Sequence, residues 1–212
     1  MDVTELETPH GPARVHLQPV AGAVAALVLG HGAGGGVQAA DLAAVSEVAQ
    51  SLGVSVALVE QPYRVAGRRS PAPAKQLDGA WLAVLEQLRA EPLRGLALIG
   101  GGRSSGARVA CRTAQAANLA AVLCLAFPLL PPRRERAPAQ SRLAELEAVS
   151  VPTLVVQGER DPFGIPPAGP SREVVRVPGD HSLRQTAAVR AAVAAWLSRV
   201  LPRLPRTVTP AP

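Results

Sequence analysis

The chain has 212 residues, of which 48% are hydrophobic, 18% are charged and only 2% are aromatic. This length predicts one domain rather than two, and the composition is typical of a globular protein rather than a disordered one. The net charge of +6 does not favour nucleic-acid binding, because the basic residues are scattered and the one dense group is "RRER" at 133–136.

The N-terminal segment "MDVTELETPH" is acidic and lacks the basic start and apolar stretch of an export signal. No apolar run approaches the roughly 18 residues that span a bilayer. We therefore expect a cytoplasmic protein with no membrane partner. Cys111 and Cys124 lie among Ala, Leu and Val, which predicts buried, reduced thiols rather than a disulfide.

Apolar segments of strand length alternate with longer segments of helical period from Val24 onward. This order predicts an α/β fold of three layers, with a mostly parallel sheet and helices on both faces. Before it, two alternating segments flank the turn "PHGP" and predict a hairpin at the sheet edge. The eight expected strands are 3–8, 13–18, 23–30, 54–60, 95–100, 119–127, 152–158 and 173–177. The expected helices are 39–52, 75–90, 105–117, 141–148 and 183–200.

Two proline-rich segments, 63–74 and 127–140, each follow a predicted strand. The carboxyl ends of parallel strands open into a crevice, so these segments are candidate pocket walls. The end of the chain has several prolines and no apolar period. We therefore expect a single domain over 1–201 and a disordered tail over 202–212.

The first glycine-rich turn, "LGHGAGGG", has Gly30, Gly32 and Gly35 in the spacing G-x-G-x-x-G. Glu60 ends the next predicted strand, 25 residues after Gly35. A strand, these glycines and a later acid are typical of a dinucleotide-binding protein. An NAD-binding Rossmann protein is therefore one alternative.

The second glycine-rich turn, "GRSSG" at 102–106, has the pattern G-x-S-x-G between a predicted strand and a predicted helix. A phosphate-binding P-loop does not fit, because Ala97 and Arg103 replace its first glycine and its lysine. The pattern instead indicates a nucleophilic serine on a strained turn, where neighbouring side chains would collide. Ser104 is also a suitable N-cap for the following helix, which is the simpler interpretation.

A serine nucleophile requires a base and an acid that orients the base. Asp161 follows one late predicted strand and His181 follows the last, in the chain order Ser, Asp, His. Asp161 is also suited to cap the turn "DPFG", and Glu159 and Asp180 are alternative acids.

The motifs "GHGAGGG", "GGRSSGAR", "AFPLLPP", "GERDPFG" and "GDHSL" together resemble those of the α/β hydrolases. The resemblance covers most of the chain and is closest to small members without a lid, related to dienelactone hydrolase and to the branch typified by testis-expressed protein thirty. It implies an eight-stranded sheet with no large lid. It also implies Ser104 as nucleophile, His181 as general base and acid, and Asp161 as the carboxylate that holds the imidazole.

The same resemblance implies an oxyanion hole made by the backbone N–H groups of Ala33 and Ser105. We expect His31 to stabilise this turn by hydrogen bonding. Gly32, Gly102 and Gly106 are expected to be supporting residues of the site.

The expected function is a serine hydrolase that cleaves a small ester, thioester or lactone through an acyl-enzyme, with no cofactor and no metal. Arg103 is a candidate substrate-binding residue, and with the loop arginines Arg133, Arg134 and Arg136 it could attract anionic substrates. Solvated loop charge is the simpler interpretation of these arginines. The alternative function is a non-catalytic module of the same fold that binds a protein partner. The substrate and the oligomeric state are not predicted.

Overall fold

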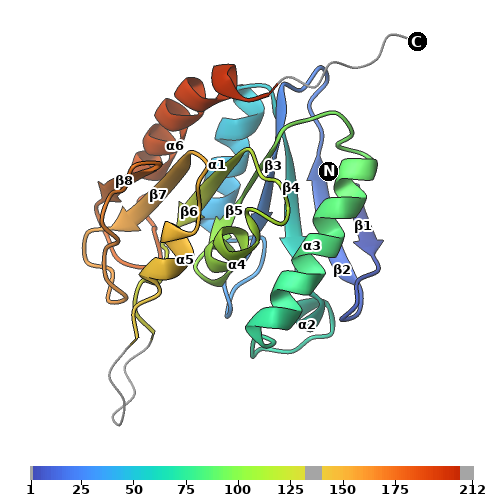
Figure 1. The fold of residues 1–212 in the computed structure, drawn as a ribbon, viewed down its shortest axis with the longest axis horizontal. Helices are drawn as coiled ribbons and strands as arrows, with labels where there is room; N and C mark the ends of the chain where they lie inside the picture. The colour runs from blue at the N-terminus through green and yellow to red at the C-terminus, as the bar shows by residue number, and fades with distance from the viewer. Residues whose placement is uncertain (1, 132–139, 206–212) are drawn as a thin grey trace.

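One eight-stranded sheet organises the computed structural model, which describes residues 2–131 and 140–205 (Figure 1). The strands are β1 (Asp2–Leu6), β2 (Ala13–Gln18), β3 (Ala25–Gly30), β4 (Val54–Glu60), β5 (Leu98–Arg103), β6 (Ala121–Leu125), β7 (Thr153–Gly158) and β8 (Arg172–Val177). Their order across the sheet is β1-β2-β4-β3-β5-β6-β7-β8. The β1–β2 and β2–β4 pairs are antiparallel and the others are parallel, which confirms the expected mostly parallel sheet with an edge hairpin.

Helices cover both faces of the sheet (Figure 1). They are α1 (Ala40–Ser51), α2 (Pro62–Val65), α3 (Ala74–Ala90), α4 (Ser105–Thr113), α5 (Leu143–Glu147) and α6 (Thr186–Val200). Side chains of α3, α4 and α5 share one core with the sheet, and side chains of α1 and α6 share the other. The three-layer arrangement confirms the expected fold class.

The central strand β3 shows why the sequence folds in this way. All six of its residues are buried. Ala26 and Val28 belong to the core beneath α3 and α4, whereas Leu27 and Leu29 belong to the core beneath α1 and α6. Successive side chains of a strand point to opposite faces, so a continuous apolar run is what a sheet covered on both sides requires.

The strand before the serine is longer than its apolar run. We expected it to end at residue 100, but β5 continues to Arg103. The sheet pairing explains the difference, because Gly102 pairs with Gly30 of β3 and with Cys124 of β6. The glycines therefore lie inside the sheet, and the bend falls on Ser104 itself.

Other expected boundaries also differ. The helix expected over 105–117 ends at Thr113, and the one expected from 183 begins at Thr186. Leu183 has a φ of 48°, which is outside the helical region. The segment 63–74, expected as loop, contains most of the short helix α2.

The carboxyl-terminal end packs further than expected. Instead of disorder from residue 202, a 3-10 turn (Leu201–Arg203) follows α6, and Leu204 is only 9% exposed against the core of α1 and α6. The rest of the tail, 206–212, lies outside the described residues, as do Arg133, Arg134 and Arg136.

Cys111 of α4 and Cys124 of β6 are both buried, free thiols whose Sγ atoms lie 3.4 Å apart. The hydrogen-bonding contact with Cys111, together with burial, raises the pKa of the Cys124 thiol well above its ordinary value. This confirms the expected burial of both thiols.

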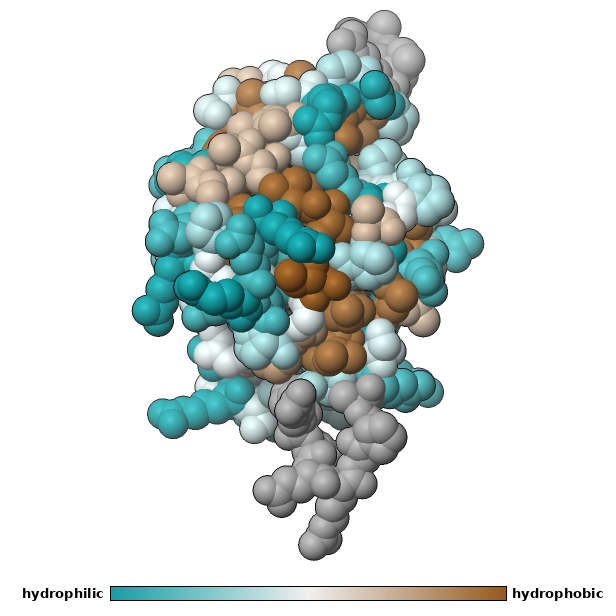
Figure 2. All heavy atoms as spheres, turned by 90° about the vertical axis from the view of Figure 1, so that its left-hand side faces the viewer, coloured by the Kyte–Doolittle hydropathy of each residue, from teal (hydrophilic) through white to brown (hydrophobic). Residues whose placement is uncertain are grey.

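The face of the molecule that includes β8 and α6 has hydrophobic residues gathered near its centre, with hydrophilic residues around them (Figure 2). In the described ranges, no helix combines the length and hydrophobicity needed to cross a bilayer.

Candidate active site

Ser104 sits on a strained turn at the carboxyl end of β5. Its backbone has a φ of 51° and a ψ of −106°, a conformation that L-residues rarely adopt. Its N–H donates to the carbonyl oxygen of Leu125 at 2.9 Å, which fixes the turn against β6. The side chain makes no capping hydrogen bond to α4, so the simpler N-cap interpretation does not apply.

The two flanking glycines allow the turn to approach the sheet closely. A Cβ atom at Gly102 would lie 2.4 Å from the carbonyl oxygen of Gly30, and one at Gly106 would lie 2.3 Å from the same atom. Both distances are far shorter than any van der Waals contact. Only glycine can therefore occupy these two positions while α4 and β3 keep their places.

The structure brings Ser104, His181 and Asp161 together in one line of contacts. Nε2 of His181 lies 3.0 Å from Oγ of Ser104, and Nδ1 lies 2.8 Å from Oδ2 of Asp161. The three residues follow β5, β8 and β7, so all stand at the same edge of the sheet. The carboxylate side chain of Asp161 is fully buried, whereas the imidazole is 19% exposed.

Further hydrogen bonds hold both oxygens of the Asp161 carboxylate. Oδ2 also accepts a bond from Nε2 of Gln157 at 2.8 Å, and Oδ1 accepts one from the backbone N–H of Phe163 at 2.9 Å. The bond to Phe163 caps the turn "DPFG", which is the alternative role that the sequence suggested for Asp161. Asp161 therefore caps its turn with one oxygen and faces His181 with the other.

The alternative acids do not reach the imidazole in the described structure. The Asp180 carboxylate accepts bonds from the backbone N–H and the hydroxyl of Ser182. These bonds lower the pKa of Asp180 below its ordinary value. Glu159 is exposed at the end of β7. Asp161 is thus the carboxylate that the fold places on His181.

Two residues of this site were missed by the sequence analysis. The ring of Phe163 packs edge-on against the imidazole of His181, with 4.6 Å between ring centroids and 72° between planes. Gln157 is fully buried in β7 and binds Asp161. Their proximity to Asp161 in the chain was the available signal, since Phe163 lies in "DPFG" and Gln157 in "VVQG".

The turn after β3 runs beside the serine. A Cβ atom at Gly32 would lie 3.6 Å from Cβ of Ser104. His31, which is 3% exposed, donates from Nδ1 to the carbonyl oxygen of Gly32 at 2.8 Å and accepts at Nε2 from the N–H of Gln61 at 3.1 Å. Burial lowers the pKa of His31. The ring is therefore neutral and serves as a brace for the turn.

Two backbone N–H groups, those of Ser105 and Ala33, are the candidate oxyanion donors of this site. Ser105 is the first residue of α4, so its N–H has no partner within the helix. For Ala33, residues 2–131 and 140–205 provide no acceptor for the N–H, while its carbonyl oxygen accepts a bond from the Tyr63 hydroxyl at 3.0 Å. Both N–H groups belong to segments that contact Ser104.

Arg103 does not extend freely into solvent. Its Nε lies 2.9 Å from Oδ2 of Asp41, and its Nη2 donates to the backbone oxygen of His181 at 2.9 Å. The Arg103 side chain is 19% exposed and that of Asp41 is 1% exposed. Burial raises the pKa of Asp41, and the charge of Arg103 opposes this shift.

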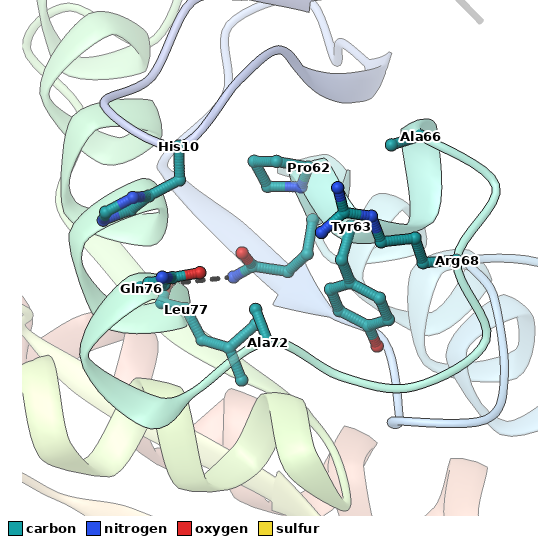
Figure 3. Close-up of a pocket in the computed structure, with 9 residues that line it drawn as sticks. His10, Pro62, Tyr63, Ala66, Arg68, Ala72, Gln76 and Leu77 are labelled. Carbon is teal, nitrogen blue, oxygen red and sulfur yellow. Dashed lines mark hydrogen bonds between the residues drawn. The ribbon is translucent and has the colours of Figure 1, made fainter.

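The expected pocket wall at 63–74 does border a cavity. A cavity of about 90 Å³ lies between α2 and the start of α3 (Figure 3). Gln61 and Tyr63 line it, with His10 on one side and Arg68 on the other. The Gln61 amide donates to the carbonyl oxygen of Leu77 across the cavity wall. Gln61 and Tyr63 thus line this cavity and also bond to the turn after β3, Gln61 to His31 and Tyr63 to Ala33.

The residues expected for a dinucleotide site are not arranged for that function. Oε2 of Glu60 lies 3.4 Å from Nη1 of Arg14 and 3.9 Å from Nε2 of His16, both on the antiparallel strand β2. The acid is therefore engaged at the hairpin side of the sheet. In the described ranges, no group of three or more His, Cys, Asp or Glu side chains could hold a metal ion.

A mostly parallel eight-stranded sheet, with a glycine-flanked serine, a histidine and an aspartate aligned at its carboxyl edge, defines the α/β hydrolase class. The sequence profile of this family, described as the alpha/beta hydrolase domain, matches residues 23–200. The chain therefore belongs to the alpha/beta hydrolase domain family. No curated protein matches the chain as a relative.

Solved structures of similar fold include a serine hydrolase without a lid. A serine hydrolase without lid from Xanthomonas campestris has 21% identity and a TM-score of 0.74, over 99% of this chain and 96% of that chain. Est1E from Butyrivibrio proteoclasticus has 14% identity and a TM-score of 0.77, over 95% and 100%. Dienelactone hydrolase from Anabaena variabilis has 17% identity and a TM-score of 0.73, over 94% and 97%. At these identities the likeness establishes the fold, and it confirms the expected architecture without a large lid.

Proposed function

We propose that this protein is a serine hydrolase that cleaves a small ester, thioester or lactone through an acyl-enzyme. The observation that carries the proposal is the continuous contact from Asp161 through His181 to Ser104, at 2.8 Å and 3.0 Å. A serine hydroxyl is a weak nucleophile by itself, and this alignment supplies the base and the orienting carboxylate that it needs. The chemistry requires only groups of the chain itself.

In the first step, Oγ of Ser104 attacks the substrate carbonyl carbon while Nε2 of His181 takes the hydroxyl proton. Asp161 accepts the Nδ1–H bond and stabilises the imidazolium. The N–H groups of Ala33 and Ser105 stabilise the negative charge on the carbonyl oxygen. When the tetrahedral intermediate collapses, the bond to the leaving alcohol or thiol breaks and His181 returns the proton to it.

In the second step, water repeats the sequence on the acyl-enzyme. Nε2 of His181 takes a proton from water as the water oxygen attacks the acyl carbon. The intermediate then collapses, the bond to Oγ of Ser104 breaks, and the serine recovers the proton. The products are the free acid and the original enzyme.

The surroundings of His181 support a substrate with an apolar part. Leu129, Leu130, Phe163 and Ile165 are half-buried, and the N–H of Leu130 donates to the carbonyl oxygen of Phe163 at 2.8 Å. These two loops therefore pack together, and Phe163 is the residue that contacts the imidazole. Half-exposed apolar side chains at a site bind the hydrocarbon part of a ligand. The solved complex of Est1E, a protein of similar fold, with ferulic acid is in keeping with a small aromatic acyl group.

A fluorophosphonate probe, which reacts with activated serines, tests the proposal. Wild type should be labelled on Ser104 and should hydrolyse p-nitrophenyl esters, and a series of acyl chain lengths reports the size of the site. The Ser104→Ala and His181→Ala variants should lose both activities, typically by about 10³-fold or more.

Ser182→Ala is the matched control, because it removes a hydroxyl next to His181 that bonds to Asp180 instead. It should react like wild type. If folded wild type is neither labelled nor active while a control esterase is, the hydrolase proposal fails and a non-catalytic module of this fold becomes the better account.

A further inference from the structure

Arg103 connects three separate segments around the serine. It is the last residue of β5 and directly precedes Ser104. Its guanidinium contacts Asp41 in the first turn of α1 and the backbone oxygen of His181. A Cβ atom at Gly32 would lie 3.1 Å from Nη1 of the same guanidinium, so the group also borders the turn after β3.

The planar shape of the guanidinium suits this arrangement. Its nitrogens form a rigid fork, so one side chain can contact two groups in a fixed relative position. Here Nη2 donates to the backbone oxygen of His181 at 2.9 Å, and Nε lies 2.9 Å from Oδ2 of Asp41 in an ion pair. The Asp41 side chain is 1% exposed, and charged contacts are stronger and less screened by salt away from water.

Arg103 contacts the backbone oxygen of His181, which lies in the loop between β8 and α6. The loop between β8 and α6 contains Gly179 and Leu183 with φ values of 118° and 48°. The backbone leaves the sheet at His181, yet the Nε2 atom of this residue must stay within hydrogen-bonding distance of Ser104. The bond from Arg103 ties this backbone directly to the residue that precedes the serine.

We propose that the Arg103–Asp41 pair is a positioning device that sets His181 relative to Ser104. Arg103 holds the backbone of the histidine loop, and Asp41 orients the guanidinium from α1. This inference rests on the proposed hydrolase function, since positioning has an effect only where Ser104 and His181 react. It also assigns Arg103 a role other than the substrate binding that the sequence suggested.

The test compares Arg103→Met, Arg103→Lys and the double variant Asp41→Asn/Arg103→Met with wild type. Arg190→Met is the matched control, because Arg190 also pairs with a carboxylate of α1, Glu47, but on the exposed surface. The readouts are the rate of fluorophosphonate labelling, kcat and KM for p-nitrophenyl acetate and for the anionic ester p-nitrophenyl succinate, and the thermal unfolding midpoint.

For Arg103→Met we expect labelling and kcat to fall by about 10- to 100-fold with KM nearly unchanged, as a misplaced reacting group produces. Arg103→Lys should recover part of this loss, because one ammonium can replace only part of the fork. Arg190→Met should react like wild type.

The double variant separates positioning from the effect of an unpaired buried charge. Arg103→Met leaves Asp41 as a buried carboxylate without its cation, whereas Asp41→Asn removes that charge. If positioning is the role, the double variant stays as slow as Arg103→Met. Recovery of wild-type rates in the double variant would overturn the inference.

Other outcomes are equally distinct. A rise in KM for the succinate ester, with kcat unchanged, would make Arg103 a substrate-binding residue instead. A labelled wild type with an equally reactive Arg103→Met variant would overturn only the positioning role. A wild type that is not labelled would overturn the proposed function and this inference with it.

Discussion

The side-chain amide of Gln157 donates to Oδ2 of Asp161 at 2.8 Å, the same carboxylate oxygen that faces Nδ1 of His181. The amide is fully buried and its Nε2 also faces the carbonyl oxygens of Phe127 and Gly164, at 3.1 Å and 2.9 Å. One amide group therefore orients the carboxylate and joins the loops that follow β6 and β7.

Replacing Gln157 with Leu should reduce ester hydrolysis by roughly tenfold, because the Asp161 carboxylate loses the donor that orients it. The free energy of unfolding should fall by about 1–3 kcal/mol, since buried acceptors lose their partner. Steady-state kinetics and urea unfolding measure the two effects. Gln87→Leu is the control, since within the described residues its amide bonds to the backbone oxygens of Glu7 and Ala83, far from the site. A Gln157→Leu variant as active as that control would contradict the prediction.

The backbone of Ser104 predicts an unusual stability difference. Its φ of 51° and ψ of −106° are the mirror image of an extended conformation, which glycine adopts without strain. Ser104→Gly should therefore be more stable than Ser104→Ala by about 1–2 kcal/mol. Thermal or urea unfolding of the two inactive variants tests this, and equal stabilities would mean that the turn relaxes when the hydroxyl is absent.

Gly106→Ala should disrupt the contact between α4 and β3. The new Cβ would lie 2.3 Å from the carbonyl oxygen and 2.5 Å from the carbonyl carbon of Gly30, and backbone atoms cannot move aside as a flexible side chain can. We expect a loss of about 3 kcal/mol or more in the free energy of unfolding. Gly36→Ala is the control, because no atom lies within 4 Å of its Cβ position, and its stability should stay close to that of wild type.

The free energy of unfolding should depend on pH because the buried imidazole of His31 titrates differently in the folded and unfolded states. Burial lowers its pKa in the folded protein below the ordinary value of about 6.5. As the pH falls below about 6.5, the unfolded chain binds a proton at this residue before the folded protein does, so the free energy of unfolding decreases. The loss continues until the pH reaches the folded-state pKa.

Urea unfolding between about pH 5 and pH 7.5, for wild type and His31→Gln, measures this contribution. The variant should lose stability less steeply as the pH falls, since Gln carries no titrating group. Burial raises the pKa of Asp41, which contributes with the opposite sign, but this group is present in both proteins and cancels in the comparison. Parallel profiles for the two proteins would show that His31 has the same pKa in the folded and unfolded states, and would contradict the prediction.

Much of the fold could be predicted because it depends on local patterns. Apolar runs identified six strands, alternating apolar and polar residues identified the two strands of the edge hairpin, and glycines around Ser104 indicated a strained turn. Boundaries were less accurate where pairing extends beyond the apolar run, as in β5, or where packing continues past the expected end, as at Leu204. In both cases neighbouring elements stabilise residues whose own pattern gives no signal.

The sequence by itself determined the layers of the fold, the strained backbone at Ser104 and the chain order of serine, aspartate and histidine. The spacing of apolar residues and the glycines around Ser104 can be read directly from the sequence. Only the tertiary structure decided that Asp161 rather than Asp180 faces His181, that Gln157 orients this carboxylate, and that Arg103 pairs with Asp41. Gln157 is only four residues from Asp161, but its side-chain orientation depends on how β7 packs in the sheet. The other two contacts join segments that are distant in the chain, and they form because parallel strands deliver their carboxyl ends to the same edge of the sheet.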